Sequence, residues 1–161
     1  MRITKRSNLA LRVLMFCGVN QGRLVTKHDI AEKCNSSENH LGQVVNQLSQ
    51  NGIVATVRGR GGGIRLGKDA ADIKIGQIFR LLEADTPVAE CFADVDNTCP
   101  LSSACRLKEA IGQAVDAFYE KLDELTLQDL IEDNQSLEQI LCLDMDVACA
   151  NQKREPIYSA G

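Results

Sequence analysis

Residues 53–66 have the sequence IVATVRGRGGGIRL, which predicts a β-hairpin. The part before the turn is rich in β-branched side chains, residues 58–63 contain four glycines, and residues 64–66 alternate between outward and inward positions. The turn carries Arg58 and Arg60 between glycines. Because glycine has no side chain to obstruct them, both arginines can reach far from the hairpin, towards a phosphate backbone or a minor groove.

Three helices are predicted before the hairpin, each from apolar periodicity and a residue type that caps helix N-termini. The first is largely apolar and ends near Gly18, and the third ends at Asn51. The capping candidates are, in chain order, Ser7 or Asn8, Thr26, and Ser36 or Ser37. This order predicts a winged helix-turn-helix in which the third helix is the recognition helix and the hairpin is the wing.

The polar face of the third helix carries amides, hydroxyls and a histidine, which suit base edges and phosphates. Its members are Ser37, Asn39, His40, Gln43, Asn46 and Gln47. We therefore predict contacts to a double-stranded DNA operator. The predicted contact residues are Ser37, Asn39, His40, Gln43 and Asn46 of the helix and Arg58, Arg60 and Arg65 of the hairpin.

The charge is distributed unevenly along the chain. The net charge is -4, but residues 1–70 carry 11 Lys and Arg against 4 Asp and Glu, whereas residues 71–161 carry 7 against 18. The basic half can approach a polyanion, and the acidic half would be repelled by one.

Beyond the hairpin, a further amphipathic helix is predicted around residues 73–82, and Thr86-Pro87 then introduces a loop from Val88 to Ala104. A long helix follows, with apolar residues at spacings of three and four. Its apolar seam consists of Leu107, Ile111, Ala114, Phe118, Leu122 and Leu125. Such a seam needs a partner helix. Thr126 and Asp129 predict a capping box at the start of a last short helix.

Seven cysteines, an odd count without a secretory signal, argue against a disulfide framework and predict reduced thiols. Cys91, Cys99 and Cys105 fall within fifteen residues. Three soft ligands on a loop before a helix suit an iron–sulfur cluster. Zinc stays an alternative, although no histidine is near in the sequence, and so do three unlinked surface thiols.

Several other classes of protein are not favoured. No apolar run approaches the roughly 20 residues needed to span a bilayer, and the N-terminus lacks the features of a signal peptide, so we expect a cytoplasmic protein without a membrane partner. The catalytic motifs G-x-S-x-G and H-E-x-x-H and a P-loop are missing, and we do not expect an enzyme.

The sequence resembles the iron–sulfur winged-helix transcriptional repressors, the family of nitric-oxide-sensing NsrR, iron-responsive RirA and the cluster-assembly regulator IscR. The resemblance covers about residues 1–143. Its most specific parts are residues 56–66, the three-cysteine loop, Cys105-Arg106-Leu107-Lys108, and the run TLQDL at 126–130 followed by Glu132, Asn134 and Gln135. It implies a homodimer with crossing long helices, with Cys91, Cys99 and Cys105 as cluster ligands, and DNA binding that is lost when the cluster is damaged.

The resemblance leaves the fourth ligand open. Some NsrR proteins use an acidic residue near the start of the first helix of the other subunit, and this chain has Asn8 at the matching position. A neutral amide is a poor iron ligand beside a carboxylate or thiolate. The fourth site is therefore water, a small thiol, Asn8 of the other subunit, or another residue.

These observations predict a mainly α-helical protein with a small β-hairpin wing, in which a winged helix-turn-helix is joined to a long dimerisation helix. We expect a DNA-binding domain at 1–84, a cluster-binding loop at 85–104, a dimerisation helix and a short helix at 105–143, and a flexible tail at 144–161. The predicted function is a repressor controlled by a 4Fe-4S or 2Fe-2S cluster that senses nitric oxide. The alternatives are an iron-responsive regulator of the RirA kind, a thiol or zinc redox switch, and a scaffold that does not bind DNA.

Overall fold

A computed structural model describes residues 3–83, 86–93, 95 and 97–143 of the chain. The elements are, in chain order, α1 (Lys5–Val19), α2 (Lys27–Lys33), α3 (Glu38–Gln50), β1 (Val54–Val57), β2 (Gly63–Leu66), η1 (Ala70–Asp72), α4 (Ile75–Glu83), η2 (Glu90–Phe92), α5 (Arg106–Asp123), α6 (Leu127–Ile131) and α7 (Gln135–Leu141). The predicted fold class, mainly helical with one β-hairpin, is confirmed.

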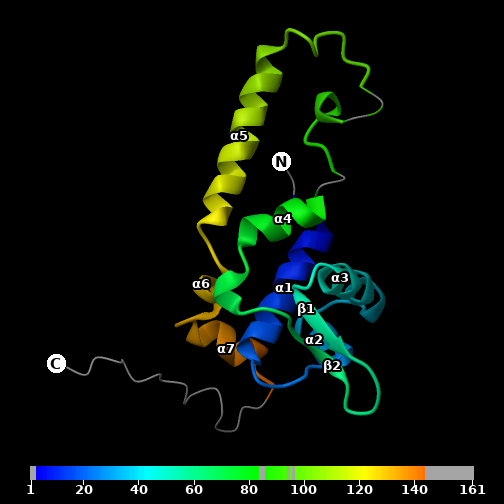
Figure 1. Cartoon of the computed structure of the whole chain (residues 1–161), viewed down its shortest axis with the longest axis vertical. Helices are drawn as coiled ribbons and strands as arrows, with labels where there is room; N and C mark the ends of the chain where they lie inside the picture. Colours follow the sequence, from blue (N-terminus) through cyan, green and yellow to red (C-terminus); the bar gives the residue numbers. More distant parts are fainter. Residues whose placement is uncertain (1–2, 84–85, 94, 96, 144–161) are drawn as a thin grey trace, which may run out of the picture.

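Figure 1 shows two regions. The head consists of residues 3–83 together with α6 and α7, and the arm consists of α5 and the described residues of the loop at 86–105. The arm projects from the head, with α5 running alongside the loop. Among the described residues, none of the helices combines the length and the apolar character needed to cross a membrane.

Helix α1 lies at the centre of the head. Val13, Leu14 and Phe16 have no exposed surface. The helices α3, α4, α6 and α7 and the strand β2 all pack against α1. Burial of a side chain of this size contributes about 1.5–3 kcal/mol, so α1 organises most of the stability of the head.

The hairpin is antiparallel, with Val54 opposite Leu66 and Val57 opposite Gly63. Val25 extends the pairing: its N–H donates to the Ile64 carbonyl at 2.9 Å, and its own carbonyl accepts the Ile64 N–H at 2.8 Å. The turn contains Gly59 and Gly61 at φ values of 99° and 79°. Only glycine enters this left-handed region without steric cost, which explains the glycine-rich sequence of the predicted wing.

The helix starts match the capping candidates in two of three cases. The Thr26 hydroxyl caps α2 with the reciprocal Asp29 contact of a capping box, and Ser37 caps α3. The expected cap of α1 is wrong, because Thr4 caps this helix by accepting the Ser7 N–H at 3.2 Å. Ser7 instead lies buried in the first turn, and its hydroxyl donates to the Glu83 carboxylate at the end of α4.

Helix α5 confirms the predicted long helix, although it ends at Asp123, before the last seam residue, Leu125. No residue of α5 is buried, and Leu107 near its start is 68% exposed. Within the single chain, the seam residues Leu107, Ala114 and Leu125 are therefore exposed, and Ile111, Phe118 and Leu122 are half-buried.

The arm meets the head where the C-terminal end of α5 packs on α4. The Arg80 guanidinium lies 2.6 Å from the Asp123 carboxylate and 4.8 Å from the centre of the Tyr119 ring. The rings of Phe79 and Phe118 meet edge to face, with centres 6.2 Å apart. This junction places an ion pair, a cation–π contact and an aromatic pair between the two regions.

The chain returns to the head after α5. The predicted capping box at Thr126 and Asp129 is confirmed, but two helices follow it instead of one. Leu127 of α6 is fully buried, and the buried Asn20 amide donates to the Leu141 carbonyl of α7 at 3.0 Å. Both helices thus close the core around α1. The expected tail at 144–161 lies outside the described residues.

Candidate nucleic-acid interface and cysteine loop

The helix-turn-helix consists of α2 and α3, which pack against each other. The Thr26 hydroxyl donates to the Asp29 carboxylate at 2.7 Å, and this hydrogen bond is the main cause that lowers the pKa of Asp29. A negative side chain in the first turn also suits the positive end of a helix. Asn35 in the connecting turn has a φ of 47°. The geometry between the two helices is thus held by local hydrogen bonds and a sharp turn.

The exposed face of α3 carries the predicted contact residues. Ser37, Asn39, His40, Gln43 and Asn46 are all exposed. Gln47 differs from the prediction: its amide donates to the Leu81 carbonyl at 3.4 Å and lies half-buried against α4. The other amides of this face stay available to a ligand.

The first turn of α3 fixes one of these side chains. Ser37 Oγ accepts the backbone N–H of His40 at 3.4 Å and lies 3.1 Å from His40 Nδ1. The other histidine, His28, lies with its Nδ1 3.5 Å from the Glu38 carboxylate. Glu38 of α3 thus contacts His28 of α2.

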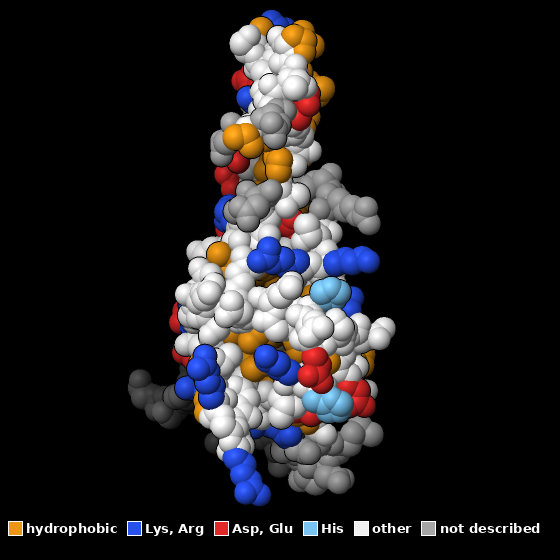
Figure 2. Space-filling view, turned by 90° about the vertical axis from the view of Figure 1, so that its right-hand side faces the viewer, with side chains coloured by type: hydrophobic (Ala, Val, Ile, Leu, Met, Phe, Trp, Pro, Cys, Tyr) orange, Lys and Arg blue, Asp and Glu red, His pale blue; other side chains and the backbone are white. Residues whose placement is uncertain are grey.

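The wing carries the remaining predicted contact residues. Arg58, Arg60 and Arg65 are exposed and make no ion pair within the described part of the chain. Figure 2 shows one face of the molecule, on which Lys and Arg side chains lie over the head and at its lower end. Both histidines are visible on this face. Helix and wing together present hydrogen-bonding groups flanked by positive charge, as DNA binding requires.

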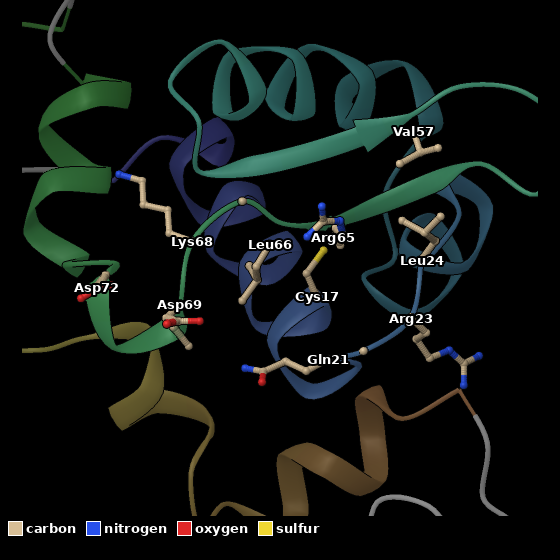
Figure 3. Close-up of a pocket in the computed structure, with 13 residues that line it drawn as sticks. Cys17, Gln21, Arg23, Leu24, Val57, Arg65, Leu66, Lys68, Asp69 and Asp72 are labelled. Atoms are coloured by element: carbon tan, nitrogen blue, oxygen red, sulfur yellow. The ribbon is translucent and has the colours of Figure 1, made fainter.

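A hollow of about 740 Å³ opens beside β2. Lys68 lies on one side of it and Arg23 on the other, with Arg65 between them (Figure 3). Lys68 and Arg23 add positive charge next to the wing, but they are outside the predicted contact set, because nothing in the sequence distinguishes them from other surface cations. Asp69 and Asp72 also line the hollow, so its walls carry charges of both signs.

The three loop cysteines lie on the arm. Cys91 lies in η2, Cys99 lies in the loop, and Cys105 caps α5 by accepting the Lys108 N–H on its sulfur at 3.4 Å. All three are free and half-buried. Their chemistry fits an iron–sulfur cluster, which is bound through thiolates. The structure does not bring them together, because among the described residues no three His, Cys, Asp or Glu side chains are grouped so that they would hold a metal ion.

The head cysteines differ from those of the loop. Cys17 is buried in α1, and this burial, with the nearby Cys34 as a smaller cause, raises the pKa of its thiol to about 12. Burial also raises the pKa of Cys34. Both therefore stay protonated and unreactive near neutral pH. The expectation that all cysteines are reduced is wrong for Cys142, which is disulfide-bonded.

Asn8, the residue considered for the fourth ligand site, is exposed on the first turn of α1. This turn is attached to the end of α4, because the Glu83 carboxylate accepts the backbone N–H of Thr4 at 3.0 Å and its hydroxyl at 2.8 Å. The loop that carries Cys91 begins directly after α4. These contacts within the head thus hold the turn that carries Asn8 at the end of α4, where the loop of the arm begins.

Comparison with protein families matches residues 3–133 to Rrf2, described as an iron-dependent transcriptional regulator. The chain belongs to the Rrf2 family. It is therefore a transcriptional regulator and not an enzyme, and helix-turn-helix DNA binding is the property of the Rrf2 relatives that it resembles.

Two curated Rrf2 relatives span almost the same length. The chain is 41% identical to the HTH-type transcriptional regulator NsrR of Bacillus subtilis over 142 residues, which are 88% of this chain and 97% of that relative. Identity to NsrR of Geobacillus kaustophilus is 42% over the same coverage. The resemblance to NsrR-type repressors predicted from the motifs is confirmed at the level of the family.

Solved structures confirm the winged-helix Rrf2 fold. Oxidised CymR of Staphylococcus aureus is 28% identical, with a TM-score of 0.65 over 82% of this chain and 97% of that structure. IscR of T. potens is 25% identical, with a TM-score of 0.65 over 84% and 90%.

Proposed function

We propose that this Rrf2 protein is a homodimeric repressor whose operator binding is controlled by an iron–sulfur cluster that responds to nitric oxide. The observation that carries the proposal is the contrast between its cysteines. Cys91, Cys99 and Cys105 are free, half-buried and close in sequence, whereas Cys17 and Cys34 are buried with raised thiol pKa values. Among the cysteines that the structure describes, those of the loop are the ones that are both free and accessible to a metal cluster, and they lie in a chain 41% identical to NsrR.

The DNA side of the proposal rests on α3 and the wing. The five contact residues of α3 and the three wing arginines are exposed on the basic head. In a dimer, two such heads would contact half-sites about one helical turn, roughly 34–36 Å, apart. The partly exposed apolar seam of α5 supports dimerisation, because a helix without a buried residue gains stability by packing against a second copy.

The cysteines of the loop would hold the cluster. When bound, the cluster supplies iron that nitric oxide attacks, and the chain supplies the ligands and the connection to the head. Glu83, the last residue of α4, precedes Cys91 by eight positions in the chain, and its carboxylate is hydrogen-bonded to Thr4 and Ser7 at the start of α1. Asn8 lies on this turn, and its neutral amide leaves the fourth site weakly held.

Iron status is a second candidate signal. The matching family is described as iron-dependent, and a weakly held fourth site also makes a cluster easier to dismantle when iron is scarce. The two signals differ in the reagent that releases DNA. Nitric oxide would act on a loaded cluster directly, whereas an iron chelator would act by removing it.

The cluster is tested with protein purified without oxygen. We expect visible absorption and bound iron in the wild type, loss of both in Cys99→Ala, and retention of both in the matched variant Cys17→Ala. Operator binding is measured while nitric oxide or a chelator is added. Full iron content in Cys99→Ala would contradict the ligand assignment. DNA binding that responds to thiol oxidants in a protein without iron would identify the thiol switch instead.

The wing is tested by salt dependence. Arg60→Ala should weaken DNA binding and reduce the salt slope by about one counterion, with little change in melting temperature, because Arg60 is exposed. Lys121→Ala is the matched control, since it removes an exposed positive charge from the arm, where Lys121 pairs with Glu124. An equal slope in Arg60→Ala and the wild type would contradict the wing contact.

A further inference from the structure

The first turn of α3 holds the imidazole of His40 in one orientation. Ser37 Oγ lies 3.1 Å from His40 Nδ1 and also accepts the His40 backbone N–H at 3.4 Å. Both side chains are exposed on the face of α3 assigned to DNA. The hydroxyl therefore links the helix cap to a side chain that a base edge can reach.

The direction of this hydrogen bond determines which tautomer His40 adopts. A neutral imidazole carries one N–H, and the serine hydroxyl has one proton to donate. The hydroxyl oxygen already accepts a backbone N–H, and the unpaired N–H groups of the first turn make the surroundings of Nδ1 positive. Both features favour an unprotonated Nδ1 that accepts the Ser37 proton. The hydrogen then resides on Nε2, the outer ring nitrogen.

We infer that Ser37 is a positioning residue that presents His40 as an Nε2–H donor, and that His40 thereby selects guanine in each half-site. Guanine offers two adjacent acceptors, N7 and O6, in the major groove. Adenine offers N7 beside an N6 donor, thymine offers O4 beside a methyl group, and cytosine presents an N4 donor that would oppose the imidazole N–H, so guanine is the base that suits a fixed N–H donor best. The inference rests on the proposed DNA interface and adds to it the donor, its fixed tautomer and the base it recognises.

The neighbouring side chains do not compete for this role. The Glu38 carboxylate lies 3.5 Å from His28 Nδ1, and the His40 imidazole has its hydrogen bond with Ser37. Asn39 and Gln43 carry amides. An amide that rotates by 180° exchanges its donor and its acceptor, so neither side chain is committed to one hydrogen-bonding role. Among the exposed side chains of this first turn, His40 is the one whose hydrogen-bonding role a neighbour determines.

The experiment selects duplexes from a random library with the full-length protein, purified without oxygen. The wild type should enrich guanine at one position of each half-site, and His40→Ala should reduce that preference about five- to tenfold. Ser37→Thr keeps the hydroxyl and should keep the preference. Ser37→Gly should lose most of it without unfolding α3, because glycine is also accepted well at helix N-caps.

A modified base tests the contact directly. When 7-deazaguanine replaces the selected guanine, its N7 acceptor is lost, so the Kd of the wild type should rise several-fold while that of His40→Ala should not rise further. Equal losses in both proteins, or full guanine preference in Ser37→Gly, would overturn the inference. If His40→Ala and Arg60→Ala both leave selection and affinity unchanged, the proposed DNA interface fails as well, which separates the two failures.

Discussion

The head and the arm of this regulator bury their apolar side chains to very different degrees. In the head, Val13, Leu14 and Phe16 of α1 have no exposed surface, and helices from both ends of the chain cover them. In the arm, α5 has no buried residue, and Leu107 is 68% exposed. The head therefore carries its own stability, whereas the apolar surface of the arm is available to a second subunit.

The largest effect should come from removing the same side chain in the two regions. Leu14→Ala should lower the free energy of unfolding by about 2–5 kcal/mol, because it leaves a cavity in the closed core. Leu107→Ala should change it by less than about 0.5 kcal/mol at low protein concentration, because the side chain is exposed there. Urea unfolding followed by circular dichroism measures both.

The arm variant has a second readout. Leu107→Ala should increase the monomer fraction in sedimentation experiments, because Leu107 begins the apolar seam. Similar losses of unfolding free energy in the two variants at low concentration would mean that Leu107 is as buried as Leu14. The difference in burial between arm and head would then not hold.

A smaller effect is expected at the junction. A Cβ on Gly76 would lie 2.9 Å from the Tyr119 carbonyl and closer still to the Asp123 carboxylate, whose Oδ1 is buried without a hydrogen-bond partner. Gly76→Ala should therefore separate α4 from α5 and cost about 1–3 kcal/mol in thermal unfolding.

The matched control for the junction is Gly42→Ala in α3. A Cβ at Gly42 meets only Lys27 Nζ at 3.8 Å. Alanine is the better helix former by about 1 kcal/mol, so this variant should be slightly stabilised. If Gly76→Ala were as stable as Gly42→Ala, the close contact between α4 and α5 would not limit the size of the side chain at position 76.

The smallest effect concerns pH. Partial burial acts to raise the pKa of Glu83, but hydrogen bonds from Ser7 and Thr4 together lower it below its ordinary value. A lowered folded-state pKa adds stability above the ordinary pKa of about 4.3, and this stability is lost as pH falls through the folded pKa. Glu83→Gln should therefore cost on the order of 1 kcal/mol at pH 7 and almost nothing once the pH has fallen below the folded-state pKa of Glu83.

Unfolding free energies of wild type and Glu83→Gln across this pH range test the prediction. Glu109→Gln, which neutralises an exposed carboxylate on α5, serves as the control and should give no pH-dependent difference. A constant difference between wild type and Glu83→Gln at all pH values would show that the charge of Glu83 is not what holds the first turn of α1 to the end of α4.

Sequence reasoning succeeded where the signal was local. The capping boxes at Thr26 and Thr126 and the glycine turn of the wing depend on neighbouring residues, and the structure has them as predicted. It failed where contacts between residues far apart in the sequence determine the position of a side chain. Gln47 turns to the Leu81 carbonyl, and Thr4 replaces Ser7 as the cap because Glu83 of α4 binds both.

The cysteine site shows the same limit. Spacing alone suggested that Cys91, Cys99 and Cys105 act together, and their free, half-buried state agrees with that. Their mutual geometry depends on a loop with little regular structure besides η2, and spacing carries no information about such a conformation. Tests of cluster ligation therefore have to be made on the loaded protein.

The return of α6 to the head imposes an order on biosynthesis. Gly18 is so close to α6 that a Cβ there would lie 2.9 Å from Ile131 Cδ1, and the two residues are separated by 113 positions. A ribosome adding about 5–20 residues per second needs roughly 6–23 s to synthesise the intervening chain. Until then, the surface of α1 that Leu127 and Ile131 will cover is open to solvent. The thiol loop therefore leaves the ribosome before the head can close.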